Sequence, residues 1–312
     1  MRMTRFLGMA AVAVALTLGS IHLSLLSSAA TAGDHAVAAA TPDVTVGPQY
    51  DTTHVLVPPE DFDRFVGSVL ATFGGTASPK QAAVTVTPTL SSTMLQAIFT
   101  PVGTFSVFGF TTPVPYPFGA ERTGYLVTDM DAAIRAARAT GADVVVNPFN
   151  DPIGRDAIIQ FPGGVNTQLY WHPTAPSYKP LEAIPENRVY VSSDKVAAFV
   201  LSFLAFSHGK VVSDDAQAPG VEVGSPGRTY RRIRIESGFG RLTALVTNGQ
   251  LPFPSGRETI GFEVANLADT LSKAKAAGAR ILVARYGTVE RDAALVQFPG
   301  GFIAEIHSHV GK

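Results

Sequence analysis

The sequence predicts an α+β protein of two tandem domains, each built from paired βαβββ units. The first observation behind this prediction is a hairpin-like stretch that occurs twice, at Arg155–Gly164 and at Arg291–Gly301. Each copy is an alternating apolar run that is broken by Pro-Gly-Gly and followed by a second alternating run, which is typical of a β-hairpin. A repeated hairpin indicates a repeated domain.

The second observation is the spacing between the two halves. Gly163 and Gly300 in the two hairpins are 137 positions apart (300 − 163), whereas Phe65 and Phe199 in the upstream helices are 134 apart (199 − 65). The difference of three residues is expected to fall in a connecting loop, where insertions are tolerated. Because this period is far too long for a solenoid, the chain is interpreted as a duplicated domain.

The third observation is the order of the predicted elements. Apolar periodicity in the first half predicts a strand at 53–57, a helix at 60–73 and strands at 83–87, 93–100 and 104–111. It then predicts a strand at 124–128, a helix at 130–140 and strands at 144–147, 157–161 and 167–171. Asp129 is expected to cap the second helix and Gly141 to follow its C-terminus. The first half is therefore two βαβββ units.

The second half shows the same order. The predicted elements are strands at 188–191, 230–235 and 241–246 around a helix at 195–206, and then strands at 261–264, 281–283, 293–298 and 303–306 with a helix at 267–277. Lys210–Pro226 contains several Gly and Pro residues and is interpreted as a solvated loop, with a lid as the alternative. Pro173–Pro185 contains several prolines and is interpreted as a linker.

Composition limits the class of protein. With 312 residues, 46% of them hydrophobic, the chain is long enough for two domains with ordinary cores. A net charge of −1, without a cluster of Lys or Arg, argues against nucleic acid as the main partner. The absence of cysteine excludes disulfides, thiolate nucleophiles and cysteine-based zinc sites.

The N-terminus predicts export. Residues 1–32 combine Arg2 and Arg5, an apolar run and the small-residue motif Ala30-Thr31-Ala32, which together are typical of a cleaved signal peptide. An uncleaved membrane anchor is the alternative, because the run approaches the roughly 20 residues that span a bilayer. Residues 33–49 are expected to be a disordered lead-in. The mature protein is thus expected to be periplasmic or secreted, with no stable membrane span.

These features together resemble the vicinal oxygen chelate superfamily, the glyoxalase, bleomycin-resistance and extradiol-dioxygenase group. The resemblance rests on the paired βαβββ units, the strand and Asp-capped helix around Gly124–Asp131, and the Phe-Pro-Gly-Gly hairpins followed by Gln168 or Glu305. It implies a first glyoxalase-like domain at 50–172, a linker at 173–186 and a second domain at 187–312. Each domain would form a cupped, partly closed sheet.

The resemblance also implies where a site would lie. Metal-using members hold a divalent ion with a His on the first strand, a His or carboxylate on the first strand of the second unit, and a Glu on the last strand. The corresponding positions are His54, Arg122 and Gln168 in the first domain and Arg188, Thr259 and Glu305 in the second. Neither set is complete, because an arginine keeps its charge and cannot coordinate a metal.

Several residues therefore stay open as ligands. His54, Gln168 and Glu305 are the candidates for a divalent metal, and the cofactor prediction is either none or such a metal. A shift of one residue in the second unit would replace Arg122 by Glu121, or Thr259 by Glu258, and would turn that side chain to the other face of the strand. Other side chains that could belong to a site are His172, His307, His309, Tyr116, Phe118, Tyr170 and Trp171. The alternatives for these are surface histidines and core aromatics, and a hydrogen-bonded structural histidine for His54.

The resulting hypothesis is an exported glyoxalase-like protein that binds or turns over a small oxygen-rich or aromatic molecule in the first cup. His54, Arg122 and Gln168 would be its polar groups, and Arg122 favours an anionic ligand. Arg188 and Glu305 would form an ion pair in place of a metal, and the second domain would close the first cup or form a homodimer. The alternative is a metal-dependent lyase, isomerase or dioxygenase with ligands such as Glu121, His172 or His307.

Overall fold

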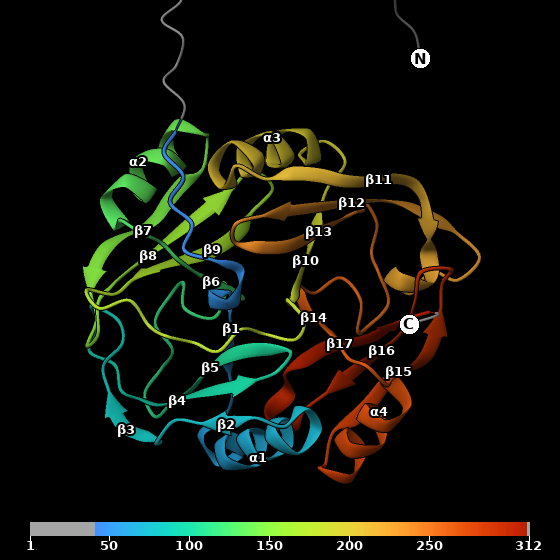
Figure 1. Ribbon diagram of the computed structural model, residues 1–312, viewed down its shortest axis with the longest axis horizontal. Helices are drawn as coiled ribbons and strands as arrows, with labels where there is room; N and C mark the ends of the chain where they lie inside the picture. The colour runs from blue at the N-terminus through green and yellow to red at the C-terminus, as the bar shows by residue number, and fades with distance from the viewer. Residues whose placement is uncertain (1–40, 311–312) are drawn as a thin grey trace, which may run out of the picture. The chain divides into compact units, whose positions relative to one another are not determined.

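The computed structural model describes residues 41–310, so the predicted signal peptide at 1–32 and residues 33–40 of the predicted lead-in lie outside the described residues. The described chain contains two mixed β-sheets (Figure 1). The first sheet has the spatial order β2 (Thr76–Ala77), β4 (Thr93–Thr100), β5 (Gly103–Phe110), β1 (Thr52–Leu56), β6 (Thr123–Leu126), β9 (Val165–Trp171), β8 (Arg155–Phe161) and β7 (Asp143–Asn150), and β3 (Gln81–Val84) pairs with β4.

The second sheet repeats this arrangement, except that β11 alone takes the place of β2 and β3. Its spatial order is β11 (Lys210–Pro219), β12 (Thr229–Ser237), β13 (Gly240–Val246), β10 (Glu186–Val191), β14 (Thr259–Glu263), β17 (Ile303–His309), β16 (Arg291–Gln297) and β15 (Arg280–Gly287). In both sheets the first strand of each unit pairs in parallel with the last strand of its own unit. The fold is therefore α+β with two tandem domains of paired βαβββ units, as the repeat predicts.

Four α-helices cover the sheets. They are α1 (Phe62–Phe73), α2 (Met130–Ala139), α3 (Val196–Ser207) and α4 (Leu267–Ala276). Short 3-10 turns occur at Pro48–Tyr50, Pro59–Asp61, Gly220–Val223 and Pro299–Gly301. None of the helices within residues 41–310 is both long and apolar enough to cross a membrane.

Helix ends follow the sequence signals. The Asp129 carboxylate accepts a hydrogen bond of 2.7 Å from the backbone N–H of Ala132, so it caps α2 as expected. Asn266 caps α4 in the same way, with a bond of 3.0 Å from Asp269 N–H. Gly141 follows α2 with φ of +89°, a conformation that glycine adopts without strain.

Each hydrophobic core joins one unit from each half of the chain. One core packs α2 and its strands against α3 and strands β10, β12 and β13. The other packs α1 and its strands against α4 and strands β14, β16 and β17, and in Figure 1 α1 lies beside α4. Phe105 of β5 stacks on Phe262 of β14 at 5.1 Å between ring centroids. The described residues form one compact unit, and the boundaries 50–172, 173–186 and 187–312 stay a prediction about the repeat.

One predicted element is wrong. The segment interpreted as a loop at Lys210–Pro226 contains β11, an edge strand of ten residues that pairs with β12, followed by the 3-10 turn Gly220–Val223. Its alternating polar residues concealed the strand, because an edge strand that faces solvent lacks an apolar face. β11 is the strand that completes the third βαβββ unit.

Candidate functional site

A cavity of about 200 Å³ lies on the face of the first sheet that carries His54 and Gln168. A second cavity of about 80 Å³ adjoins it, and the two share Val86, Phe108, Asp156 and Gln168 as lining residues. We call the two cavities together the first cup. Strand alternation explains its lining, because opposed residues on neighbouring strands share a face.

The register shows which side chains share that face. His54 of β1 is opposite Ser106 of β5, and Gly124 of β6 is opposite Gln168 of β9. A Cβ atom on Gly124 would lie 2.8 Å from Nε2 of His54, so the histidine ring lies directly over this glycine. Glycine at this position leaves room for the imidazole between β1 and β9.

His54 faces a buried carboxylate. Its Nδ1 lies 3.7 Å from Oε1 of Glu121, and both side chains are buried. Glu121 Oε1 accepts a hydrogen bond of 3.2 Å from Gly119 N–H, whereas Glu121 Oε2 and His54 Nδ1 have no hydrogen-bond partner in the described chain. Buried polar atoms without partners are costly, so this pair is a place where a bound group would be stabilised.

Asp156 joins the two cavities. Burial and, to a smaller extent, the nearby Asp151 raise the pKa of its carboxyl from 3.8 to about 8, against the opposing effect of a hydrogen bond with Gln168. The carboxyl is therefore mainly protonated at neutral pH and can donate a hydrogen bond as well as accept one.

The remaining lining divides into a polar and an apolar end. At the polar end the hydroxyl of Tyr170 donates a bond of 2.6 Å to the carbonyl of Tyr50 and lies 3.2 Å from the Thr52 hydroxyl. His172 also lines this end, and burial lowers its pKa. The apolar end is formed by Phe108, Pro115, Tyr116, Pro117, Phe118, Val146, Phe149 and Ile158. Of the four aromatic residues predicted for a pocket or the core, Trp171 packs against a core and the other three line the first cup.

Arg122 does not lie in the first cup. Its Nη1 donates a bond of 2.8 Å to the carbonyl of Gly119, and its side chain lines a different cavity, together with Asn187, Thr259 and Glu258. The Arg122 carbonyl accepts a bond of 2.9 Å from the backbone N–H of His54, so the two backbones are paired, but the Arg122 side chain turns away from the cup. The expectation that this side chain lies with those of His54 and Gln168 is therefore wrong, and Glu121 faces His54 instead.

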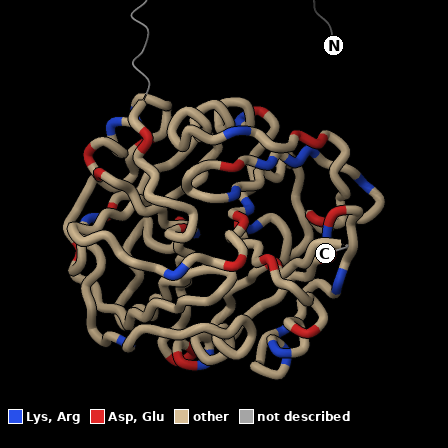
Figure 2. The backbone as a smooth tube through the Cα atoms, viewed as in Figure 1, with Lys and Arg blue, Asp and Glu red and all other residues tan. Residues whose placement is uncertain are grey.

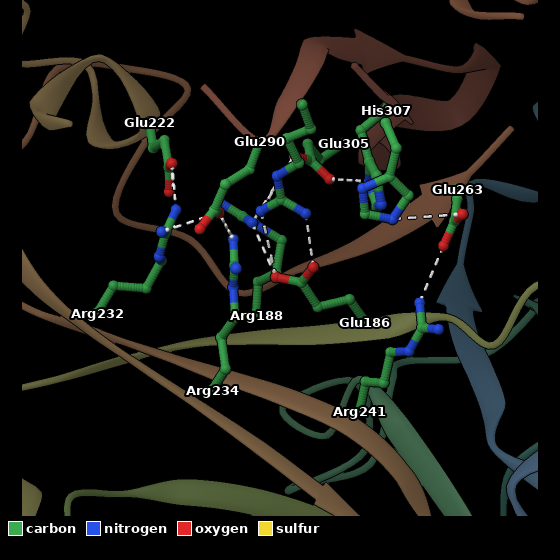
Figure 3. A network of polar contacts seen from close by, with 12 residues as sticks. Glu186, Arg188, Glu222, Arg232, Arg234, Arg241, Glu263, Glu290, Glu305 and His307 are labelled. Atoms are coloured by element: carbon green, nitrogen blue, oxygen red, sulfur yellow. Dashed lines mark hydrogen bonds and ion pairs between the residues drawn. The ribbon is translucent and has the colours of Figure 1, made fainter. Parts of the chain in front are cut away.

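The corresponding face of the second sheet carries charged side chains, which we call the second cup (Figure 3). Arg188 Nη1 lies 3.0 Å from Glu186 Oε1 and 3.7 Å from Glu305 Oε1. Arg291 lies 2.6 Å from Glu186 and 3.6 Å from Glu305, and His307 Nδ1 lies 2.8 Å from Glu305 Oε2. The predicted Arg188–Glu305 ion pair is thus one contact within a group of five buried residues.

A second group of ion pairs fills the other end of this cup. The fully buried Arg232 pairs with Glu222 and lies 3.1 Å from Glu290, which also lies 2.6 Å from Arg234. The hydroxyl of Tyr230 donates a bond of 2.6 Å to Glu222. Glu222 belongs to the turn that follows β11, so the segment predicted as a loop or lid closes the second cup from one side.

The buried charges balance one another. Burial alone would raise the pKa of Glu305, but Arg291, Arg188 and His307 lower it to about 2. The same two arginines lower the pKa of Glu186 well below its usual range despite its burial. Across the described chain blue and red segments are mixed, and neither colour collects on one side in Figure 2.

A difference of one residue in length explains why Arg291 faces the second cup whereas Arg155 does not face the first. Arg155 precedes Phe161 by six positions, whereas Arg291 precedes Phe298 by seven (161 − 155 and 298 − 291). In the first sheet Asp156 is opposite Tyr170 on the cup face, and Arg155 points away toward Asp131 at 3.0 Å. In the second sheet Ala293 is opposite His307, so Arg291 shares the cup face. A shift of one residue exchanges the faces of a strand.

The two cups differ in whether their residues could bind a divalent metal. In the second cup the guanidinium groups of Arg188 and Arg291 surround Glu305 and supply the positive charge that a cation would bring, so a metal does not fit there. In the first cup His54, Glu121 and Gln168 offer a ring nitrogen, a carboxylate and an amide oxygen, all of which can bind a divalent ion. Within residues 41–310 no three or more His, Asp or Glu side chains form a metal-binding group.

The other predicted ligands lie apart from a common centre. His309 Nε2 lies 3.3 Å from Glu263 and its side chain is partly exposed, and His307 is held by Glu305. Glu258 lies in the cavity with Arg122, where burial raises its pKa to about 7 against the opposing effect of Arg122.

Sequence reasoning assigned no role to Asp156, Glu186 or Arg291. The signal for Glu186 was present, because it stands two residues before Arg188 and strand alternation places both on one face. The signal for Asp156 and Arg291 was the unequal length of the two hairpin copies, which shows only when each arginine is counted from the Phe-Pro-Gly-Gly motif.

The buried charge network gives a stability prediction. Arg188→Ala removes one of the two arginines that balance the charges of Glu186 and Glu305. We therefore expect the free energy of unfolding to fall by about 3–5 kcal/mol. Arg188→Met combined with Glu305→Leu keeps the Glu186–Arg291 pair intact and should cost less. Urea unfolding of both variants measures this. A single variant that is no less stable than the double variant would contradict a balanced network.

Asp156 gives a pH prediction. Because its folded pKa is raised from 3.8 to about 8, the unfolded chain releases its proton first as pH rises, and Asp156 lowers stability progressively between about pH 4 and 8. Asp156→Asn should flatten this decline in urea unfolding measured across that range. Asp131→Asn is the control, because Asp131 is exposed and its pKa is lowered, so it is already ionised throughout the window. An unchanged slope in Asp156→Asn would show that the carboxyl ionises normally.

The sequence matches no protein-family model and none of the curated proteins compared with it. Solved structures do match the fold. A mutant of 4-hydroxymandelate synthase from Streptomyces coelicolor superimposes with a TM-score of 0.57 at 12% identity, over 86% of this chain and 93% of that one. The 2,3-dioxygenase LapB from Pseudomonas sp. KL28 gives a TM-score of 0.52 at 11% identity, over 85% and 93%.

A third match is a fusion of a xylose isomerase-like TIM barrel with 4-hydroxyphenylpyruvate dioxygenase, with a TM-score of 0.53 at 12% identity. It covers 87% of this chain and 50% of the fusion protein. At these identities the likeness concerns the fold. The order of strands in both sheets and these superpositions show that the chain has the fold of the vicinal oxygen chelate superfamily.

Proposed function

We propose that the first cup binds, or binds and converts, a small molecule that carries an oxygen-rich polar end and an aromatic or apolar end. The observation that carries this proposal is the division of the first cup, in which His54 and Tyr170 lie in one cavity, Phe118 and Phe149 lie in the other, and Asp156 lines both. Small-molecule sites are mostly apolar cavities with a few polar groups that fix the orientation of the ligand.

The charge of the cup favours an uncharged or cationic ligand. Among the described residues that line its two cavities none is Lys or Arg, whereas Asp151 and Asp156 are acidic and Glu121 lies behind His54. Arg122, which supported an anionic ligand in the sequence, lies outside this cup. A protonated Asp156 could donate a hydrogen bond to a ligand oxygen, and His54 could accept or donate a proton beside it.

The second candidate is a metal-dependent lyase or dioxygenase of the glyoxalase-like type that uses the first cup. It is favoured by the two buried atoms without partners, His54 Nδ1 and Glu121 Oε2. Those two residues, with Gln168, would hold the ion, which would act as a Lewis acid toward substrate oxygens. The second cup would then be structural in either case.

Metal analysis distinguishes the two candidates. Purified protein is incubated with Mn²⁺, Fe²⁺ or Zn²⁺, dialysed and analysed for bound metal, together with His54→Ala and Glu121→Gln. The metal-dependent reading predicts about one ion per chain in the wild type and a loss of at least tenfold in affinity in either variant. If all three proteins retained the metal equally, the metal would not be bound in the first cup. No retained metal favours the binding reading, for which His54→Ala should weaken ligand binding with little effect on folding.

Export is also part of the proposal. It is supported by the signal-like sequence of residues 1–32, with its basic start and its Ala30-Thr31-Ala32 motif. An intact-mass measurement on protein from the native host should give a chain that begins near Gly33. A mass that corresponds to a chain beginning at Met1 would favour the membrane-anchor alternative.

A further inference from the structure

Helix α3 has an apolar outer side. None of its residues is charged, and Leu201 in the middle of the helix is 71% exposed. At 3.6 residues per turn, Leu201 lies on the side opposite the three phenylalanines that α3 contributes to the core, Phe199, Phe203 and Phe206. The other exposed residues of the helix are Ala197, Ala198 and Ala205. A surface helix normally has polar residues on its outer side, and a helix that is apolar on all sides is normally buried.

The corresponding helix of the first half does not have this surface. With the spacing of 134 that relates the two upstream helices, the exposed residues of α3 correspond to Asp63, Arg64, Gly67 and Ala71 of α1. These four residues of α1 are also exposed. In α3 two alanines thus replace a charged pair, and a leucine replaces a glycine. The outer side of α3 has therefore lost the polar character of its counterpart.

The other two α-helices of the described chain also carry charge on their outer sides. The exposed charged residues are Asp131, Arg135 and Arg138 in α2 and Asp269, Lys273 and Lys275 in α4. All four helices cover equivalent parts of the repeated βαβββ unit, so the apolar surface of α3 is not a requirement of the fold. Contiguous exposed apolar surface of this kind is typical of a protein contact.

The exposed positions of α3 are arranged symmetrically along the helix. Ala197 and Ala205 each lie four residues from Leu201 (201 − 197 and 205 − 201). If two copies of α3 packed antiparallel around a two-fold axis at Leu201, Ala197 of each copy would lie against Ala205 of the other. The small alanine side chains would let the two helices approach closely, and the same surface would serve both copies, as in other two-fold dimers.

The ends of α3 are complementary in charge in the same arrangement. Asp194 lies seven residues before Leu201 and His208 lies seven residues after it (201 − 194 and 208 − 201), and both are exposed. Antiparallel packing would place each Asp194 carboxylate beside the His208 imidazole of the second copy, close to Lys210. It would also bring the positive end of each helix dipole to the negative end of the other.

We propose that the outer side of α3 is a homodimer interface, in which two copies of the chain pack their α3 helices antiparallel around a two-fold axis at Leu201. No residue of α3 lines a cavity of either cup, so the inference is independent of the proposed function. A helix of 12 residues is about 18 Å long and buries a small area, so we expect a dissociation constant on the order of 1–100 μM.

Sedimentation velocity across the range around that constant, on protein from the native host, tests the interface. Leu201→Glu would bury two unpaired carboxylates in each dimer, so dimerisation should weaken at least tenfold. Gly67→Glu is the matched control, because Gly67 is the corresponding position in α1 and a Cβ atom there meets nothing within 4 Å. This control should dimerise as the wild type does. Urea unfolding of each variant shows whether the fold is retained.

An exchange of charges tests the antiparallel arrangement. His208→Asp would place two carboxylates opposite each other at both ends of the interface, so we expect dimerisation to weaken by about threefold to tenfold. Aspartate is tolerated at the φ of +51° that His208 adopts. Adding Asp194→His to that variant restores an opposite pair and should return the dissociation constant to within twofold of the wild type. If the second change restores nothing, the antiparallel arrangement is overturned.

Other outcomes would assign the surface to a different occupant. The Thr41 hydroxyl donates a bond of 2.9 Å to the carbonyl of Ala205, so the described chain begins beside α3. A wild type that is monomeric at every concentration, and that Leu201→Glu makes less stable to urea, would overturn the dimer in favour of the segment before Thr41. A monomer that sediments with phosphatidylcholine vesicles only when Leu201 is present would overturn it in favour of a lipid surface. A dimer that Leu201→Glu leaves unchanged would show that the copies meet elsewhere.

Discussion

Side chains alternate between the two faces of a β-strand, and this alternation determines which residues line each cup. The two sheets have the same strand order, so the same positions face both cups, and only the residue types and the register of the strands can distinguish them. One additional residue between Arg291 and Phe298 brings an arginine onto the cup face of the second sheet, whereas the shorter first copy presents Asp156. A change in length therefore accounts for Arg291, whereas Arg188 in place of His54 and Glu305 in place of Gln168 are changes of residue type at the same register.

The two cups also differ in how their buried polar groups are satisfied. In the second cup each buried carboxylate of the network lies close to an arginine, and Glu186 and Glu305 remain ionised because the opposite charges outweigh the cost of burial. In the first cup Asp156 avoids the same cost by keeping its proton, and His54 and Glu121 face one another without a hydrogen bond. Glu305 Oε1 in the second cup also lacks a hydrogen-bond partner, and Glu186, Arg291 and His307 line a cavity of about 290 Å³. The difference is that two arginines balance the charge of Glu305, whereas none of the described residues that line the first cup is Lys or Arg.

Much of the fold could be predicted from the sequence. The repeat indicates how elements far apart in the chain are arranged, whereas apolar periodicity alone predicts only the individual helices and strands. The duplicated hairpin and the Asp129 and Gly141 helix signals are local and strong, and the structure confirms them. β11 was missed because a solvent-facing edge strand has no apolar period. At the site, His54 and Gln168 were placed by strand position, whereas the Arg122 side chain binds the carbonyl of Gly119 and lines a different cavity although its own carbonyl is paired with His54. Asp156 and the arginine network depend on register between strands, which the sequence encodes only through small differences in length.

The segment between the two sheets has a role beyond connection. Tyr178, within the predicted linker, lines the first cup and packs against Tyr50 and Phe99, and the Tyr50 hydroxyl holds the same segment through the carbonyl of Pro176 at 2.8 Å. The wall of the first cup is therefore completed by chain that is synthesised after every strand of its own sheet. The first cup therefore gains Tyr178 in its wall only after the segment that follows its last strand has packed against Tyr50 and Phe99.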